Sequence, residues 1–100
     1  MQIVALKLVT IIAEAVLNDR LIRELKGMGA KGYTITQVRG EGSRGVRASD
    51  WEGQNVKIET LVSAVVADNI LQHLADHYFT LYAVVAYVQT VEVVRGDKYT

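Results

Sequence analysis

The chain opens with two segments whose apolar residues repeat at different periods. Residues 2–9 are mostly aliphatic or β-branched, with a single lysine, and predict a buried β-strand. Apolar residues then recur every three or four positions with charged residues between them, which indicates an amphipathic helix ending near Gly27 and Gly29. The apolar stripe of this helix consists of Leu17, Leu21, Leu25 and Met28.

The middle of the chain predicts two strands joined by a long loop. Residues 33–38 alternate threonines with larger side chains, which is the period-two pattern of a strand, and residues 56–62 resume strand character. Between them, residues 40–53 contain four glycines, two serines and several charges around Trp51. This composition favours a loop.

The last third of the chain predicts a helix followed by a strand. The helix has the clearest apolar stripe in the chain, formed by Ala67, Ile70, Leu71, Leu74, Ala75 and Tyr78. Residues 82–94 are rich in valine and tyrosine, and the length of this run suits a strand at the centre of a sheet or one that extends beyond its own subunit.

The resulting order is strand, helix, strand, strand, helix, strand. This order predicts an α+β fold, the ferredoxin-like βαββαβ sandwich, in which two helices cover one face of a four-stranded antiparallel sheet. One hundred residues suit a single hydrophobic core, so residues 1–100 are expected to form one domain.

The two helices can cover only one face of this sheet, yet the strands are apolar on both faces. Val4, Leu6 and Leu8 alternate with other aliphatic residues, and residues 84–88 are apolar except for one tyrosine hydroxyl. A monomer would leave a contiguous apolar patch in water, which usually marks an interface. We therefore expect a homo-oligomer of closed cyclic symmetry with the sheets facing inward.

Composition excludes several classes of function. Eleven basic and eleven acidic residues give a formal charge of zero, so the molecule as a whole has no electrostatic attraction for nucleic acid or anionic lipid. Cysteine is absent, which excludes disulfides and thiol chemistry. Lys7 interrupts the apolar run at residues 3–12 and no basic segment precedes it, so we read the run as a strand of a cytoplasmic domain rather than as a signal peptide.

Catalytic or metal-binding groups are sparse. His73 and His77 stand four residues apart and could share a metal on one side of a helix, but both are expected to lie on its solvent side. Glu14, Asp19 and Glu24 are expected to be solvated charges without a carboxylate partner. The sequence therefore predicts no catalytic residue and no metal site.

The segment Gly40-Glu41-Gly42-Ser43-Arg44-Gly45-Val46-Arg47 has the chemistry of a phosphate-binding loop. Glycines let backbone N–H groups approach an anion closely, a serine hydroxyl donates a hydrogen bond, and two guanidinium groups pair with phosphate oxygens. A surface hairpin with no ligand would have a similar composition, so this segment alone leaves both interpretations open.

Three motifs together resemble the PII signalling superfamily over nearly the whole chain. They are Gly29-Ala30-Lys31-Gly32-Tyr33-Thr34, Gly40-x-Gly42-Ser43-Arg44-x-x-Arg47 and Val56-Lys57-Ile58-Glu59. The first two are similar to those of the SbtB branch of PII-like carbon sensors. The resemblance implies a homotrimer with nucleotide sites in the clefts between subunits.

The resemblance also implies which residues bind the nucleotide. Gly32, Tyr33 and Thr34 would frame adenine and ribose, and residues at the base of the T-loop, the family's long loop between strands 2 and 3, would hold the phosphate. The T-loop residues are Gly40, Gly42, Ser43, Arg44 and Arg47. The remaining candidates are Lys57, Tyr87, Gln89 and Arg95.

The chain departs from the classical PII pattern in ways that affect its ligands. Residues 82–87 contain neither the glycine nor the lysine of the loop that holds a triphosphate in classical members, so the expected effectors are cyclic AMP, AMP, ADP and ATP without strong selectivity for ATP. No cofactor is implied. The T-loop has no tyrosine, so uridylylation is not expected, and the redox hairpin of some SbtB members is missing from this sequence.

The resemblance implies a regulatory role at a membrane. Ligand-dependent ordering of residues 40–53 would gate a partner, which in SbtB-like proteins is a bicarbonate transporter at the cytoplasmic membrane face. Trp51 is a candidate anchor for this partner, or it packs on its own subunit. Alternatives are another PII-like sensor tied to carboxysomes or to a different transporter, a trimeric metal-binding protein of the same fold, and an RNA-binding module.

Overall fold

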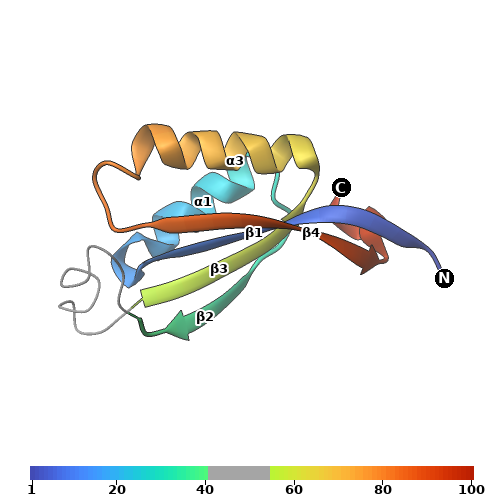
Figure 1. The fold of residues 1–100 in the computed structure, drawn as a ribbon, viewed down its shortest axis with the longest axis horizontal. Helices are drawn as coiled ribbons and strands as arrows, with labels where there is room; N and C mark the ends of the chain where they lie inside the picture. The colour runs from blue at the N-terminus through green and yellow to red at the C-terminus, as the bar shows by residue number, and fades with distance from the viewer. Residues whose placement is uncertain (41–54) are drawn as a thin grey trace.

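The computed structural model describes residues 1–40 and 55–100. A long first strand is followed by a helix, two strands, a second helix and a last strand (Figure 1). In chain order the elements are β1 (Ile3–Glu14), the single 3₁₀ turn η1 (Ala15–Leu17), α1 (Asn18–Gly27), β2 (Thr34–Val38), β3 (Asn55–Val62), α3 (Ala64–His77), β4 (Val85–Val94) and the 3₁₀ turn η2 (Gly96–Tyr99).

The strands form one antiparallel sheet in the order β2-β3-β1-β4. β1 lies in the interior of the sheet and pairs along its length with β4 on one side and with β3 on the other. Lys7, on β1, donates a 2.7 Å hydrogen bond from its ammonium group to the hydroxyl of Thr90 on β4, the residue opposite it. Both helices lie on the same side of the sheet (Figure 1), and the predicted ferredoxin-like fold is confirmed.

The core lies between the helices and the sheet face that they cover. Alternate strand residues point to this helix-covered face, among them Val9, Ile11 and Ile58, each fully buried. The leucine stripe of α1 and the isoleucine and leucine of α3 pack against them. Complete burial of each such side chain contributes about 1.5–3 kcal/mol relative to exposure. The apolar stripes predicted from the sequence therefore place both helices.

The two helices have recognisable end signals. Gly27 is the last residue of α1, and Gly29, two residues later, has φ +112°, a left-handed conformation that favours glycine. The side chain of Ser63, directly before α3, accepts a 3.3 Å hydrogen bond from the N–H of Val66 and caps the helix N-terminus.

The structure corrects three sequence predictions about where elements end and which residues face the core. β1 continues to Glu14, five residues beyond the predicted end, because Ile11 and Ala13 maintain the alternation beneath the helices. β4 begins at Val85 rather than at residue 82, since the preceding residues still belong to the turn after α3. Ala75 was placed on the apolar stripe but is exposed, because one residue beyond Leu74 is a rotation of about 100° around the helix.

The opposite, helix-free face of the sheet carries both apolar and polar side chains. The strand register places Tyr87, Thr10, Glu59 and Thr34 in one row across the four strands, and Val85, Ile12, Lys57 and Thr36 in the next. Val85 is 54% exposed and Tyr87 44% exposed. Large apolar side chains thus remain accessible on this face, while the predicted homo-oligomer that would cover it stays a prediction.

Within the two described stretches, no helix combines the length and the apolar character needed to cross a membrane.

Candidate functional site

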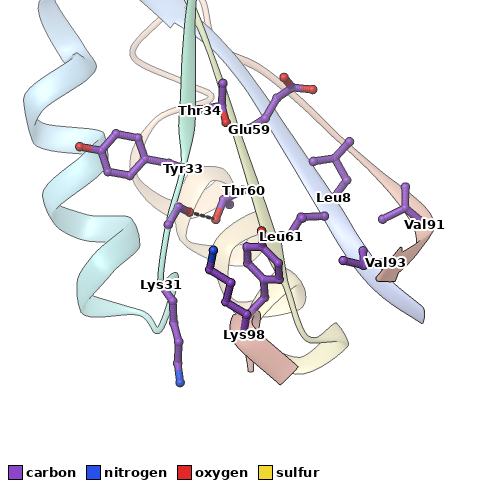
Figure 2. A pocket seen from close by; sticks show the side chains of 12 residues that line it. Leu8, Lys31, Tyr33, Thr34, Glu59, Thr60, Leu61, Val91, Val93 and Lys98 are labelled. Carbon is purple, nitrogen blue, oxygen red and sulfur yellow. Dashed lines mark hydrogen bonds between the residues drawn. The ribbon is translucent and has the colours of Figure 1, made fainter. Parts of the chain in front are cut away.

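A pocket of about 600 Å³ opens on the helix-free face, between the start of β2, the end of β3 and η2 (Figure 2). Its floor is apolar and comes from β1, β3 and β4, while polar groups from the segment after α1 and from η2 form its rim. The lining residues are Leu8, Lys31, Gly32, Tyr33, Thr34, Glu59, Thr60, Leu61, Val91, Val93, Lys98 and Tyr99.

The segment that enters the pocket after α1 is fixed to β3 by one hydrogen bond. The hydroxyl of Thr60 donates to the carbonyl oxygen of Gly32 over 2.6 Å (Figure 2). Thr60 is 2% exposed, so this bond is shielded from competition by water. The bond sets the position from which Tyr33 and Thr34 reach the pocket rim.

Tyr33 and Thr34 are both exposed at the entrance to β2. The ammonium group of Lys26 lies 5.6 Å from the centroid of the Tyr33 ring, within the range of a cation–π contact from α1. The structure therefore brings the predicted residues Gly32, Tyr33 and Thr34 together in one pocket.

The chain after β4 forms the other side of the pocket. Arg95 has φ 66°, a left-handed conformation, and the 3₁₀ turn η2 follows it directly. A Cβ on Gly96 would stand 2.6 Å from the Cβ of Val4, so the backbone of η2 passes against β1 where only glycine fits. This turn carries Lys98 and Tyr99 to the pocket.

Lys98, Tyr99, Glu59 and Thr60 line the pocket but were not predicted as site residues. The motif Val56-Lys57-Ile58-Glu59 pointed to Lys57, whereas Glu59, two residues along on the same face of β3, lies closer to the pocket. Nothing in the periodicity of the sequence signals that the chain after β4 folds back, because a short 3₁₀ turn leaves no repeating pattern.

A second polar cluster lies between α1 and α3. The carboxylate of Glu24 accepts hydrogen bonds from the hydroxyl of Tyr78 at 2.5 Å and from Nε of Arg20 at 3.3 Å, and one of its oxygens lies 2.9 Å from Nε2 of His73. The guanidinium of Arg20 also donates to the hydroxyl of Tyr82 and lies over the Tyr78 ring. The cluster joins both helices to the turn before β4.

The electrostatics of this cluster follow from burial and hydrogen bonding. Burial by itself raises the pKa of Glu24, but the hydrogen bonds to Tyr78, His73 and Arg20 outweigh it and hold that pKa below the ordinary value. Burial and the bond to Glu24 both raise the pKa of Tyr78. The hydrogen bonds to Tyr82 and Glu24 raise the pKa of Arg20.

The expectation that Glu14, Glu24 and His73 are solvated side chains was therefore wrong. Glu14, the last residue of β1, is 8% exposed. Glu24 and His73 each have a side chain only 27% exposed, because side chains of α1 and α3 meet at this point and the buried Tyr78 hydroxyl requires an acceptor. His77 is exposed, and its ring centroid lies 4.7 Å from that of His73. Within residues 1–40 and 55–100, no group of three or more His, Asp or Glu side chains is arranged to hold a metal ion.

The model of the nitrogen regulatory protein P-II matches residues 6–98. The chain belongs to the P-II family. The resemblance inferred from the three sequence motifs is thus confirmed for the family, while the narrower likeness to SbtB remains a prediction.

Solved P-II-like structures match the chain over almost its whole length. One from Thermus thermophilus, described as a PII-like signaling protein, is 62% identical, with a TM-score of 0.88 and complete coverage of both chains. CPII from Thiomonas intermedia, bound to ADP and bicarbonate, is 25% identical, with a TM-score of 0.87 and coverage of 99% of this chain and 98% of that one. A second CPII structure, bound to ADP, AMP and bicarbonate, is also 25% identical, has a TM-score of 0.82, and covers 94% of this chain and 100% of its own.

The other candidate residues of this P-II family member lie outside the pocket or outside the described residues. Lys57, Tyr87 and Gln89 share the helix-free face with the pocket, and Gln89 stands opposite the lining residue Leu8. Arg95 and Gly40 are exposed and do not line the pocket. Gly42, Ser43, Arg44, Arg47 and Trp51 fall in residues 41–54, outside the described residues.

Proposed function

We propose that the chain is a PII-like signalling protein that binds adenine nucleotides in the clefts between subunits of a homotrimer. Cyclic AMP, AMP, ADP and ATP are its effector ligands, and residues 40–53 carry the signal to a bicarbonate transporter at the cytoplasmic membrane face. The observation that carries this proposal is the pocket in which Gly32, Tyr33 and Thr34 meet an apolar floor and a basic residue from η2.

The relatives support the choice of ligands. CPII, which shares the fold and a quarter of the residues, is bound to ADP and bicarbonate in one structure and to ADP, AMP and bicarbonate in another. Nucleotide and inorganic carbon on the same protein fit a carbon sensor. We therefore extend the proposal to bicarbonate, which we expect to bind this chain when a nucleotide is present.

The position of the pocket supports a site shared between subunits. It opens on the helix-free face, where Val85 and Tyr87 remain accessible in the single chain. In a trimer with inward-facing sheets, a neighbouring subunit would close this pocket and exclude water from the ligand. In this arrangement Gly32, Tyr33 and Thr34 hold adenine and ribose, and the T-loop residues Gly40, Gly42, Ser43, Arg44 and Arg47 hold the phosphate.

Calorimetric titration with the four nucleotides tests the proposal. We expect micromolar affinity, weakened at least tenfold by Arg47→Ala, which corresponds to about 1.4 kcal/mol. Arg23→Ala is the matched control because Arg23 is exposed on α1. The nucleotide affinity of this control variant should stay within about twofold of the wild-type affinity, a free-energy change well under about 1.4 kcal/mol. Wild-type protein indifferent to every adenine nucleotide would refute the proposal.

The transporter is tested separately from the nucleotide. Membranes containing a bicarbonate transporter should retain the protein in one nucleotide state and release it in another, and Trp51→Ala should weaken this retention. If nucleotides bind but the membranes never retain the protein, the regulated partner is a different one.

A further inference from the structure

A groove of about 370 Å³ lies between α1 and β2, on the helix-covered side of the sheet. Ile35 of β2 stands opposite Ile58 of β3, yet Ile35 is 38% exposed whereas Ile58 is fully buried. The helices thus leave β2 partly uncovered, and Figure 2 shows the Tyr33 side chain extending from the start of β2 toward α1. The groove is lined by Asn18, Asp19, Ile22, Arg23, Lys26, Tyr33 and Ile35.

β2 forms one edge of the sheet and has none of the features that usually protect an edge. Among residues 1–40 and 55–100 it pairs with β3 alone. Its sequence, Thr-Ile-Thr-Gln-Val, contains neither a charged residue nor a proline, and residues 34–37 are exposed. Protein edges are commonly protected by charges, prolines or bulges, because their open N–H and C=O groups pair readily with another strand. The outer edge of β2 is therefore suited to receive one.

The position of the groove fits the side chains of such an added strand. Successive side chains of a strand point to opposite faces of the sheet, so every second one would point to the helix side, where the groove lies. Ile22, Tyr33 and Ile35 offer it apolar contacts there. An edge strand that supplies hydrogen bonds, beside a pocket that takes alternate side chains, is the arrangement by which proteins bind extended peptides.

The charges around the groove favour an acidic peptide. Arg23 and Lys26 are three residues apart on α1, so they lie on one side of that helix. Both ion pairs in the described part of the chain involve Glu24, so neither of these two cations is neutralised there. The carboxylate of Asp19 accepts a 3.3 Å hydrogen bond from the side-chain amide of Asn18. The groove thus has two cations for one carboxylate, although the whole chain has no net charge.

We propose that the groove between α1 and β2 binds an extended acidic segment of a partner protein, which adds a strand to the outer edge of β2. A second copy of this chain is a poorer fit, because the expected contact between subunits is on the helix-free face, on the other side of the sheet from the groove. The inference goes beyond the proposed nucleotide binding, since Tyr33 is the one residue that lines both the groove and the nucleotide pocket.

Fluorescein-labelled synthetic peptides and the full chain test the proposal by fluorescence anisotropy. The peptide acetyl-Glu-Thr-Val-Thr-Glu-Thr-Val-Thr-Glu-amide presents glutamate and valine on one side of an extended strand and threonine on the other. We expect it to bind, and a peptide with lysine at every glutamate position to bind about tenfold more weakly or worse, equivalent to about 1.4 kcal/mol. Of two acidic peptides N-methylated on alternate residues, one on each set, one should lose binding and the other keep it, because only one set of amides faces β2.

Two pairs of variants locate the binding site. Ile35→Glu should weaken the acidic peptide about tenfold or more, whereas Ile3→Glu, at a residue of β1 that is 51% exposed, should stay within about twofold of the wild type. Arg23→Gln and Asn69→Glu lower the net charge equally, and Asn69 is exposed on α3, so only Arg23→Gln should weaken the peptide. Ile35→Glu should still bind ADP, because Ile35 does not line the nucleotide pocket.

Amide hydrogen exchange, measured by NMR, separates a peptide from a second copy of the chain. The amides of residues 34–38 that face away from β3 should exchange rapidly in the wild-type protein and slowly once the acidic peptide is added. Slow exchange without peptide would overturn the inference, because another copy would already cover the edge. Equal binding of the acidic and lysine peptides, or no binding of either, would also overturn it. A wild-type protein that binds the acidic peptide but no ADP would support this inference and remove the proposed function.

Discussion

The hydroxyl of Thr60 donates its hydrogen bond to the carbonyl of Gly32 from a fully enclosed position on β3. The two residues are 28 positions apart in the chain, and between them lie β2 and residues 41–54. This single bond therefore ties the segment after α1 to the interior of the sheet at the point where the pocket begins.

Replacing Thr60 by valine should loosen the pocket. Thr60→Val keeps the shape of the side chain but leaves the Gly32 carbonyl without its partner, at a cost of about 1–3 kcal/mol. We expect a lower midpoint in urea unfolding and weaker binding of ADP. Thr60→Ser, which keeps the hydroxyl, should retain most of the affinity, and a valine variant with unchanged ADP binding would show that the bond does not position the site.

The Glu24 cluster should make the free energy of unfolding depend on pH in the acidic range. The pKa of Glu24 is held below its ordinary value of 4.5 in the folded chain, so its contribution is present above that pH and is lost as the pH falls through the lowered pKa. At neutral pH, Glu24→Gln should destabilise the protein by about 1–2 kcal/mol, because Tyr78 and Arg20 lose a charged acceptor.

Thermal unfolding of the wild type and Glu24→Gln between pH 7 and pH 3 measures this effect. The difference between the two proteins should start to narrow below pH 4.5, where Glu24 of the unfolded wild-type chain takes up a proton, and should level off once the pH has fallen below the lowered pKa of the folded carboxylate. Asp68→Gln on α3 is a suitable control because Asp68 is exposed. A difference that stays constant down to pH 3 would mean that the charge of Glu24 does not stabilise the fold.

Alanine at Gly96 should disturb η2. The added Cβ would meet the Cβ of Val4 at 2.6 Å, so the turn or β1 must shift, at a cost of about 1–3 kcal/mol. If the pocket is the nucleotide site, ADP binding should weaken as well, because η2 carries two of the lining residues, Lys98 and Tyr99. Gly27→Ala is the matched control: no atom lies within 4 Å of its added Cβ, and alanine in the last turn of α1 should leave stability equal or raise it by up to about 1 kcal/mol. Equal stability of the two variants would contradict the close contact.

The helix-free face of the sheet should form the contact between subunits of the homotrimer. Val85→Asp places a charge on this face, next to Ile12 of β1, where 54% of the valine is exposed in the single chain. Light scattering should give three times the mass of one chain for the wild type and a smaller mass for this variant, because burying an unpaired carboxylate costs several kcal/mol, on the order of 3–5. Val65→Asp, on the exposed side of α3, should remain trimeric. A wild-type protein that is monomeric in solution would contradict the proposal, because nucleotide clefts between subunits could not form.

The fold was predictable from the sequence because its elements carry strong periodic signals. The stripes through Leu21 and Leu74 and the alternation around Val9 and Ile58 all recur in the buried core. Boundaries were less predictable: Ile11 and Ala13 extend β1 because tertiary packing, not local composition, decides where a strand ends.

The candidate site was predictable in part. Gly32, Tyr33 and Thr34 belong to a contiguous motif, and the structure places them in one pocket. Lys98 and Glu24 were missed because their positions depend on residues distant in the chain: the turn at Gly96 brings Lys98 to the pocket wall, and Tyr78 needs Glu24 as an acceptor. Such pairings leave no spacing in a sequence that periodicity can detect.

β2 joins the two parts of the proposed sensor. Its first residue, Thr34, borders the pocket, and its last, Val38, is four residues along, roughly 13 Å at the usual rise of a strand. Among residues 1–40 and 55–100, β2 is paired with β3 alone. If a ligand binds beside Gly32, a shift of β2 along β3 would be the shortest covalent route from the pocket to Arg39 and Gly40, which precede residues 41–54.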